Sequence, residues 1–141
     1  MEITDLIKKK FGSNVKDVKT VNERRIYIEI PPAYIREASE FLFNDMKFRF
    51  SIASGIDEAD CMEILYHFSF DKEGTFVTLK VKLEKKNPEI DTISDIITGA
   101  KWIEREMHEL LGIGFRGNRD LRNLLLSPDY KGKKYPLRKD V

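Results

Sequence analysis

The sequence has one cysteine, two histidines and no glutamine among its 141 residues. A lone thiol, Cys61, forms no internal disulfide and cannot supply a zinc site or an iron–sulfur cluster by itself. The histidines, His67 and His108, stand in no HxxH or HExxH spacing; only Glu104 and His108, four residues apart, could approach a metal ion together. No glycine-rich loop follows a predicted strand with phosphate-binding spacing. We therefore expect no cofactor in this chain and no catalysis by the chain alone.

Long apolar runs are missing as well. No stretch of about 18 apolar residues could span a bilayer, and the lysines of MEITDLIKKK precede no apolar signal-peptide segment. We expect a cytoplasmic protein that meets a membrane only through a partner. The lack of glutamine, with 35% charged residues, is typical of a thermophilic source. The length and the 41% hydrophobic content are enough for one domain with a real core.

Charge is unevenly distributed along the chain. Residues 1–111 hold 17 Lys/Arg and 21 Asp/Glu, a balance of −4, whereas residues 112–141 hold 8 and 3, a balance of +5. An acidic body with a basic tail suggests an acidic partner surface. From Pro128 onward few apolar groups could offset the entropy of ordering. We divide the chain into an α+β domain at 1–111 and an extended partner-binding tail at 112–141. From Pro128 onward we expect this tail to be largely mobile until it is bound.

The apolar periodicity of the body predicts a two-layer α+β domain. Alternation indicates strands at about 15–21, 25–30, 48–52, 64–70 and 77–83, with a hairpin turn at Asp71-Lys72-Glu73-Gly74. Phe48, Phe50 and Ile52 are expected to share one face. Half-polar strands indicate an antiparallel or mixed sheet of four to five strands, covered by helices on its other face. Helices are expected at about 3–11, 32–45 and 94–111, and Leu121, Leu124 and Leu125 suggest one more helical turn.

The long helix at 94–111 has two faces. Its expected core stripe, closed by Gly112, steps by 4, 3, 4 and 3 through Ile96, Ala100, Ile103, Met107 and Leu110. Trp102, Glu106 and Glu109 fall together to one side, with Arg105 at their edge. Leaving a large side chain in water costs roughly 1.5–3 kcal/mol, so either the 112–120 loop or another protein should cover Trp102. With a protein partner, Trp102 would be the anchor, and Glu106 and Glu109 would accept hydrogen bonds from partner arginines.

Ordered motifs over residues 99–140 carry a family resemblance. They are Glu104-Arg105-Glu106, Glu109-Leu110-Leu111-Gly112-Ile113, Phe115, Gly117, Asp120-Leu121-Arg122 and Pro136-Leu137-Arg138-Lys139-Asp140. In this order and spacing they resemble the 30 kDa subunit of respiratory complex I, NADH:quinone oxidoreductase. That family includes accessory subunits of membrane-bound energy-converting nickel–iron (NiFe) hydrogenases. The chain departs from the family at Asn118-Arg119, where His-Pro is common, and His108 is closer to the hydrogenase-type members.

The resemblance implies a non-catalytic accessory and assembly subunit of the peripheral redox arm of a membrane-bound oxidoreductase. Its tail would lie over the large catalytic subunit, the 49 kDa-type homologue of the NiFe-hydrogenase large subunit, beside iron–sulfur subunits. The membrane arm would be reached indirectly, on the cytoplasmic face, and iron–sulfur clusters or a NiFe centre would belong to the partners. The implied partner-binding residues are Trp102, Glu104, Arg105, Glu106, Glu109, Phe115, Asp120, Arg122, Pro136, Leu137, Arg138, Lys139 and Asp140.

A second interpretation stays open, because basic residues alternate with Tyr130 and Tyr135 in the tail. This pattern fits a nucleic-acid-binding protein. The near-zero net charge and the acidic body count against it, and under the first interpretation no nucleic-acid partner is expected. Removal of residues 126–141 would separate the two, because only the first predicts loss of assembly with a large subunit.

Overall fold

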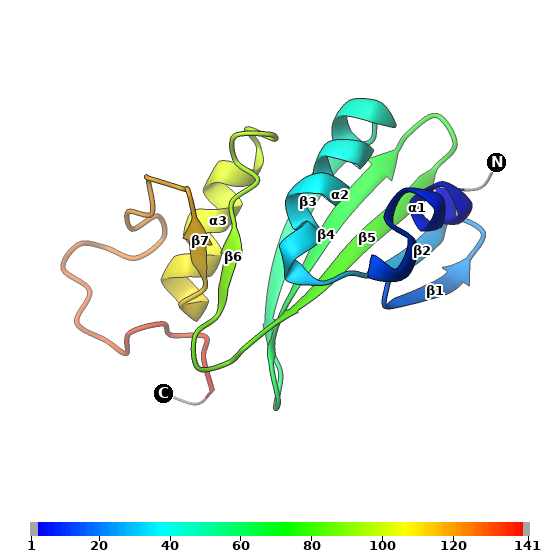
Figure 1. Cartoon of the computed structure of the whole chain (residues 1–141). Helices are drawn as coiled ribbons and strands as arrows, with labels where there is room; N and C mark the ends of the chain where they lie inside the picture. Colours follow the sequence, from blue (N-terminus) through cyan, green and yellow to red (C-terminus); the bar gives the residue numbers. More distant parts are fainter. Residues whose placement is uncertain (1–2, 140–141) are drawn as a thin grey trace.

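A computed structural model describes residues 3–139, without the side chains of residues 3 and 4. Five strands form one sheet in the order β1-β2-β5-β4-β3 (Figure 1). The strands are β1 (Asp17–Asn22), β2 (Arg25–Glu29), β3 (Arg49–Asp57), β4 (Met62–Phe70) and β5 (Thr75–Leu83). Because β2 and β5 run parallel and the other neighbours run antiparallel, the sheet is mixed. The predicted α+β class and strand number are confirmed.

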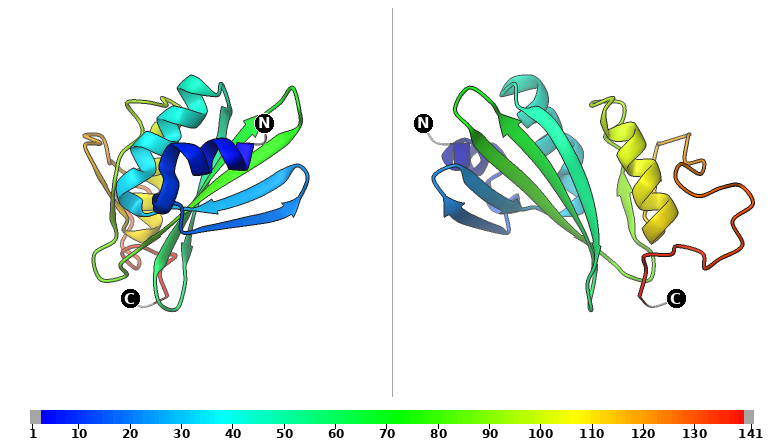
Figure 2. Two further views of the ribbon diagram at one scale, coloured as in Figure 1. Left: turned by 45° about the vertical axis from the view of Figure 1, so that its right-hand side comes forward. Right: turned by 180° about the vertical axis from the view of Figure 1, so that it is seen from behind.

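Helices cover one face of this sheet. They are α1 (Ile3–Phe11), α2 (Ile35–Glu40) and α3 (Ala100–Leu111), with a 3-10 turn at Pro32–Tyr34 and a π-helical turn at Phe41–Asp45 extending α2 on either side. The right-hand view of Figure 2 shows α1 and α2 behind the sheet and α3 beside the edge strand β3. No helix within residues 3–139 is long and apolar enough to cross a membrane.

The core lies between the helices and the covered face of the sheet. β2, β4 and β5 contribute alternate apolar side chains to it, and α1 and α2 close it with one apolar stripe each. These side chains are Ile7, Phe11, Ile26, Ile28, Ile35, Ala38, Leu42, Ile64, Tyr66, Phe68, Val77, Leu79 and Val81. The opposite face is more polar, and an ion pair of 3.0 Å joins Lys80 to Glu63 there. The predicted alternation is confirmed in these strands.

The prediction for β3 is wrong beyond Phe50. The pairing register shifts between Phe50 and Ile52, which places Phe50 opposite Phe68 but Ile52 opposite His67. One extra residue reverses the facing of every later side chain in a strand. Ile52 therefore lies on the polar face, 46% exposed, and Ala53 takes the buried position.

The prediction for α3 is wrong at its start and only partly correct in its core stripe. Ala100 and Met107 are buried as predicted, and Ile96 and Ile103 pack partly buried against the core. The helix begins at Ala100, and residues 94–99 form turns. The buried side is made by Ala100, Glu104, Met107 and Leu111, while Ile103 and Leu110 are only half-buried. This stripe is rotated because the carboxylate of Glu104 finds buried hydrogen-bond donors, as described below.

Gly112 ends α3 as predicted, with φ +75 and its N–H donating to the carbonyl of His108 at 3.0 Å. After Gly112 the chain forms β7 (Gly114–Arg116), which pairs parallel to β6 (Glu89–Asp91). This pairing joins a strand of the expected domain to a strand of the expected tail, across the expected boundary after residue 111. The predicted helical turn at residues 121–125 is wrong, because that segment contains no helical residue and only bends at Leu124 and Leu125. Glu109 supplies the hydrogen-bond acceptor that a helical turn would otherwise have supplied.

Candidate interaction surface

The inner side of α3 is fixed by the carboxylate of Glu104. It accepts hydrogen bonds from the hydroxyl of Thr92, from the N–H of Ile93 at 2.9 Å and from the Asn118 side chain at 2.9 Å. Glu104 is buried, and it joins the segment before α3 to the loop after β7. Burial raises the pKa of Glu104 against the opposing effect of these three hydrogen bonds.

The side of α3 next to the tail is fixed by Arg105 and Glu109. The Arg105 guanidinium donates to the carbonyls of Arg122 and Asn123 at 3.1 and 2.8 Å. The Glu109 carboxylate accepts the N–H groups of three consecutive residues, Leu124, Leu125 and Leu126, at 2.8–3.2 Å. Burial acts to raise the pKa of Glu109, but the three N–H groups and Arg105 outweigh it and lower the pKa.

The last described residues return to the body of the chain. The N–H of Leu137 donates to the carbonyl of Leu110 at 3.0 Å, and the Arg138 guanidinium donates to the carbonyl of Lys85 at 2.8 Å. The N–H of Lys139 donates to the Asp57 carboxylate at 2.6 Å. These contacts place the end of the tail against the ends of β3 and β5, and they bury Arg138.

The outer side of α3 carries exposed and half-buried side chains. Trp102, Glu106 and Leu110 follow one another at helical spacing of four residues, and Leu137 of the tail extends the row because its backbone is bonded to Leu110. Trp102 is 59% exposed and Leu137 58%. Of the two alternatives for covering Trp102, the 112–120 loop leaves it largely exposed. The guanidinium of Arg105 lies over the indole, 5.0 Å from the ring centroid. We call Trp102, Glu106, Leu110 and Leu137 the outer row of α3.

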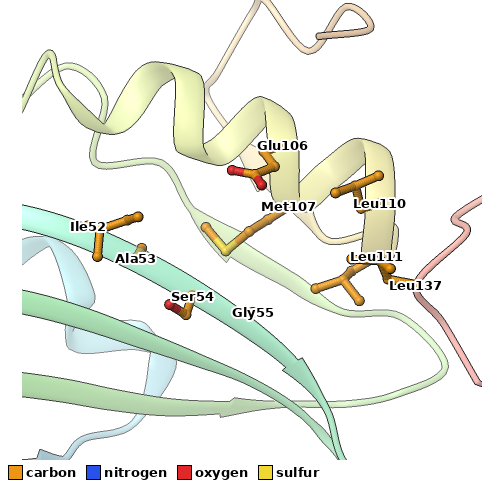
Figure 3. A pocket seen from close by; sticks show the side chains of 9 residues that line it. All are labelled: Ile52, Ala53, Ser54, Gly55, Glu106, Met107, Leu110, Leu111 and Leu137. Carbon is orange, nitrogen blue, oxygen red and sulfur yellow. The ribbon is translucent and has the colours of Figure 1, made fainter. Parts of the chain in front are cut away.

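A groove runs between the outer row and the edge strand β3. It measures about 210 Å³ and is lined by residues 52–55 of β3, by Leu137 and by Glu106, Met107, Leu110 and Leu111 of α3. In Figure 3 the side chains of Met107 and Leu111 extend from the helix toward β3. The helix comes close to β3 at Gly55, where an added Cβ would lie 2.5 Å from the Leu111 side chain. The groove is therefore narrow at Gly55 and lined mostly by apolar groups.

The structure separates the predicted partner-binding residues into two groups. Glu104, Arg105, Glu109, Phe115 and Arg138 are buried and have partners or packing within the chain. The group at or near the surface comprises Trp102, Glu106, Asp120, Arg122, Pro136, Leu137 and Lys139, and among these Arg122 pairs with Asp120 at 2.6 Å. Asp140 lies outside the described residues.

Sequence reasoning missed Ile52 and misplaced Leu110, which it assigned to the core stripe. The sequence shows that Ile52 is an apolar residue of a predicted strand. It does not show the bulge that turns the Ile52 side chain to the exposed face of the sheet. Leu110 could have been found through its spacing of eight residues from Trp102. Within residues 3–139, no group of three or more His, Cys, Asp and Glu side chains is arranged to hold a metal ion.

Comparison with known proteins gives a consistent family signal. Residues 28–141 match the family model described as the 30 kDa subunit of respiratory-chain NADH dehydrogenase. The chain is 31% identical over 134 residues to the C subunit of the F420H2 dehydrogenase of Methanosarcina mazei, covering 93% of this chain and 84% of that protein. It is 34% identical over 143 residues to the C subunit of the NADH-quinone oxidoreductase of Chloroherpeton thalassium, covering 96% of this chain but only 58% of that protein.

Two solved structures share the fold. A chain of the membrane-bound sulfane sulfur reductase, an archaeal respiratory membrane complex, superimposes with a TM-score of 0.85 at 25% identity, covering 98% of this chain and 82% of that one. A trypsin-resistant fragment of Nqo5 superimposes with a TM-score of 0.71 at 19% identity, covering 86% of this chain and 100% of the fragment, which shows likeness of fold alone.

Proposed function

The chain belongs to the family of the 30 kDa subunit of respiratory-chain NADH dehydrogenase, and from this membership we propose that it is a non-catalytic accessory subunit of a membrane-bound respiratory oxidoreductase. In this proposal it docks on the large, 49 kDa-type catalytic subunit beside iron–sulfur subunits. Those partners carry the redox groups and hold the chain peripherally on the cytoplasmic face of the membrane. The tail at 112–141 contributes to this docking.

The outer row of α3 is the observation that supports docking on a protein. Large aromatic and aliphatic side chains at exposed positions are stabilised when a partner covers them. The row lies on a helix whose other sides are fixed by Glu104, Arg105 and Glu109, so little order must be gained on binding. Asp120 and Arg122 lie next to the segment that Glu109 holds and add charged groups that a partner rim could pair with.

Truncation of the indole tests this proposal. In Trp102→Ala we expect roughly 2 kcal/mol or more of lost docking free energy, which is about a thirtyfold weaker association. The assay is co-purification of the full chain, through a tag, from gently solubilised source membranes, followed by quantitative mass spectrometry. Recovery of a large catalytic subunit with iron–sulfur and membrane subunits is the expected result for the unchanged chain.

Phe76→Ala is the matched control. Phe76 is an exposed aromatic residue on the polar face of the sheet, 43% exposed and likewise covered by an arginine, with Arg25 5.9 Å from the ring centroid. It should co-purify like the unchanged chain, and both variants should unfold at nearly the same temperature. Recovery of the unchanged chain alone, or with ribosomal or nucleic-acid material, would overturn the proposal.

A further inference from the structure

The outer edge of β3 presents main-chain hydrogen-bonding groups that no strand among the described residues pairs. β3 is the last strand of the sheet order within residues 3–139. The N–H of Glu58 donates to the carbonyl of Cys61 at 3.0 Å at the β3–β4 turn. In an antiparallel ladder such bonded pairs alternate with pairs whose N–H and C=O groups point outward. When this alternation is followed back from the turn through the regular register, the main-chain N–H and C=O groups of Ala53 and Gly55 point outward.

An edge of this kind pairs with an extended backbone. The groove beside it adds side-chain recognition, because Ile52, Leu110 and Leu137 offer apolar surface on its two walls. An occupant with apolar side chains on the groove side would bury these residues together with the main-chain groups of β3.

Glu106 fixes the charge of the occupant. Among residues 3–139 it is the one acidic side chain that lines the groove, and no cation within that range forms an ion pair with it. A carboxylate on an otherwise apolar wall is complementary to a lysine or arginine. Glu106 also belongs to the outer row of α3, so the groove continues the docking surface proposed above.

We infer that the β3 edge and this groove bind an extended, apolar segment of a partner subunit as an added strand, with a lysine or arginine of that segment at Glu106. The inference rests on the proposed function, because it names the kind of segment through which the partner docks. It gives the partner contact a defined chemistry, with backbone pairing at Ala53 and Gly55, apolar contacts at Ile52 and one charge pair at Glu106.

The test uses the assembled complex with a photoreactive benzoylphenylalanine placed at Ile52, or at Val21 as control. Val21 is an exposed aliphatic residue of β1, at the opposite edge of the sheet, and is 52% exposed. Illumination at position 52 is expected to crosslink one partner segment in which apolar residues alternate and a lysine or arginine lies near the adduct. Position 21 should give at most about a tenth of that adduct. Hydrogen exchange of the Ala53 and Gly55 amides should slow by roughly tenfold or more on assembly.

Charge variants give a second readout. Ile52→Lys and Glu106→Lys are each expected to reduce recovery of partner subunits about tenfold, and Val21→Lys should leave it unchanged. Circular dichroism checks that each variant folds. Assembly with no adduct at position 52 and unprotected Ala53 and Gly55 amides would overturn the inference while the proposed function stands. An adduct with a second copy of this chain would overturn it in favour of edge-to-edge pairing. Failure to recover any partner would instead overturn the proposed function, and the inference with it.

Discussion

The carboxylate of Glu109 holds a segment that has no regular secondary structure. Its oxygens accept the N–H groups of Leu124, Leu125 and Leu126, which would otherwise need water or a helix as acceptor. Glu104, about one and a half turns earlier on α3, has a raised pKa, whereas that of Glu109 is lowered, because burial outweighs the hydrogen bonds of Glu104. It also contributes to the raised pKa of Tyr66, for which burial is the larger cause.

Replacing Glu109 by glutamine should destabilise the isolated chain. Hydrogen bonds to a charged acceptor contribute about 1.5–3 kcal/mol, and the neutral amide would direct its own N–H groups toward the three backbone donors. We expect Glu109→Gln to lower the free energy of unfolding in urea by about 1–3 kcal/mol. Glu106 lies on the same helix and forms no ion pair within residues 3–139, so Glu106→Gln should change the free energy of unfolding by less than about 0.5 kcal/mol.

The difference in the free energy of unfolding between the unchanged chain and Glu109→Gln should depend on pH with a defined sign. The pKa of Glu109 is lowered in the folded chain, so its stabilisation is fully present above the unfolded pKa of about 4.3 and is lost as pH falls through the folded pKa. Urea titrations of the unchanged chain and of Glu109→Gln should differ most at pH 7 and converge below about pH 4. A difference that stays constant down to pH 3 would show that packing, and not the charge, makes the contribution.

At the scale of elements, the end of α3 sets the path of the tail. Gly112 has φ +75, and a Cβ there would lie 2.8 Å from the ring of Tyr135. A left-handed conformation costs a residue with a side chain roughly 1–2 kcal/mol. The closeness of Tyr135 adds a second reason for glycine, since the ring packs where the side chain would stand.

Gly112→Ala should therefore lower the free energy of unfolding by about 1–2 kcal/mol, or more if Tyr135 is displaced. Gly99→Ala is its control on the same helix. Gly99 has φ −61 and no atom within 4 Å of an added Cβ, so alanine should be neutral or slightly stabilising there. Equal destabilisation in urea by the two changes would contradict the conformational argument.

At the scale of the whole molecule, the end of the tail joins parts that are far apart in sequence. Arg138 contacts Lys85 across 53 positions, and Lys139 contacts Asp57 across 82. Asp57 is also within 2.8 Å of the ammonium of Lys85. From the sequence, Arg138 and Arg122 look equivalent as partner-binding arginines, and neither is expected to stabilise the isolated chain.

The structure predicts different outcomes for these two arginines. Arg138→Ala should lower the free energy of unfolding of the isolated chain by about 1–3 kcal/mol, because its guanidinium is buried and a carbonyl loses its donor. Arg122→Ala should leave it within about 0.5 kcal/mol, since the side chain is 79% exposed and its pair with Asp120 lies on the surface. Thermal and urea unfolding of the purified chain measure both, and equal values for the two variants would contradict the assignment.

The sequence alone predicted the α+β class, the three helices, most strands and the family, because these depend on local periodicity and on ordered motifs. The alternation of apolar residues places Tyr66 and Leu79 in the core whichever strands lie beside theirs. Gly112 ends a helix because glycine readily adopts the left-handed conformation. The bulge before Ile52 and the inward rotation of Glu104 left no such local mark.

What only the tertiary structure decided is which charged and apolar residues of α3 and the tail face inward. Glu104, Arg105, Glu109 and Arg138 are polar residues that a sequence pattern assigns to the surface, because a buried charge is costly without partners. Their partners here are backbone groups of other segments and, for Glu104, also the side chains of Thr92 and Asn118. These groups are brought close only by folding. Trp102 and Leu137 stay outside for the complementary reason, since the positions facing the sheet are already filled by Met107 and Leu111.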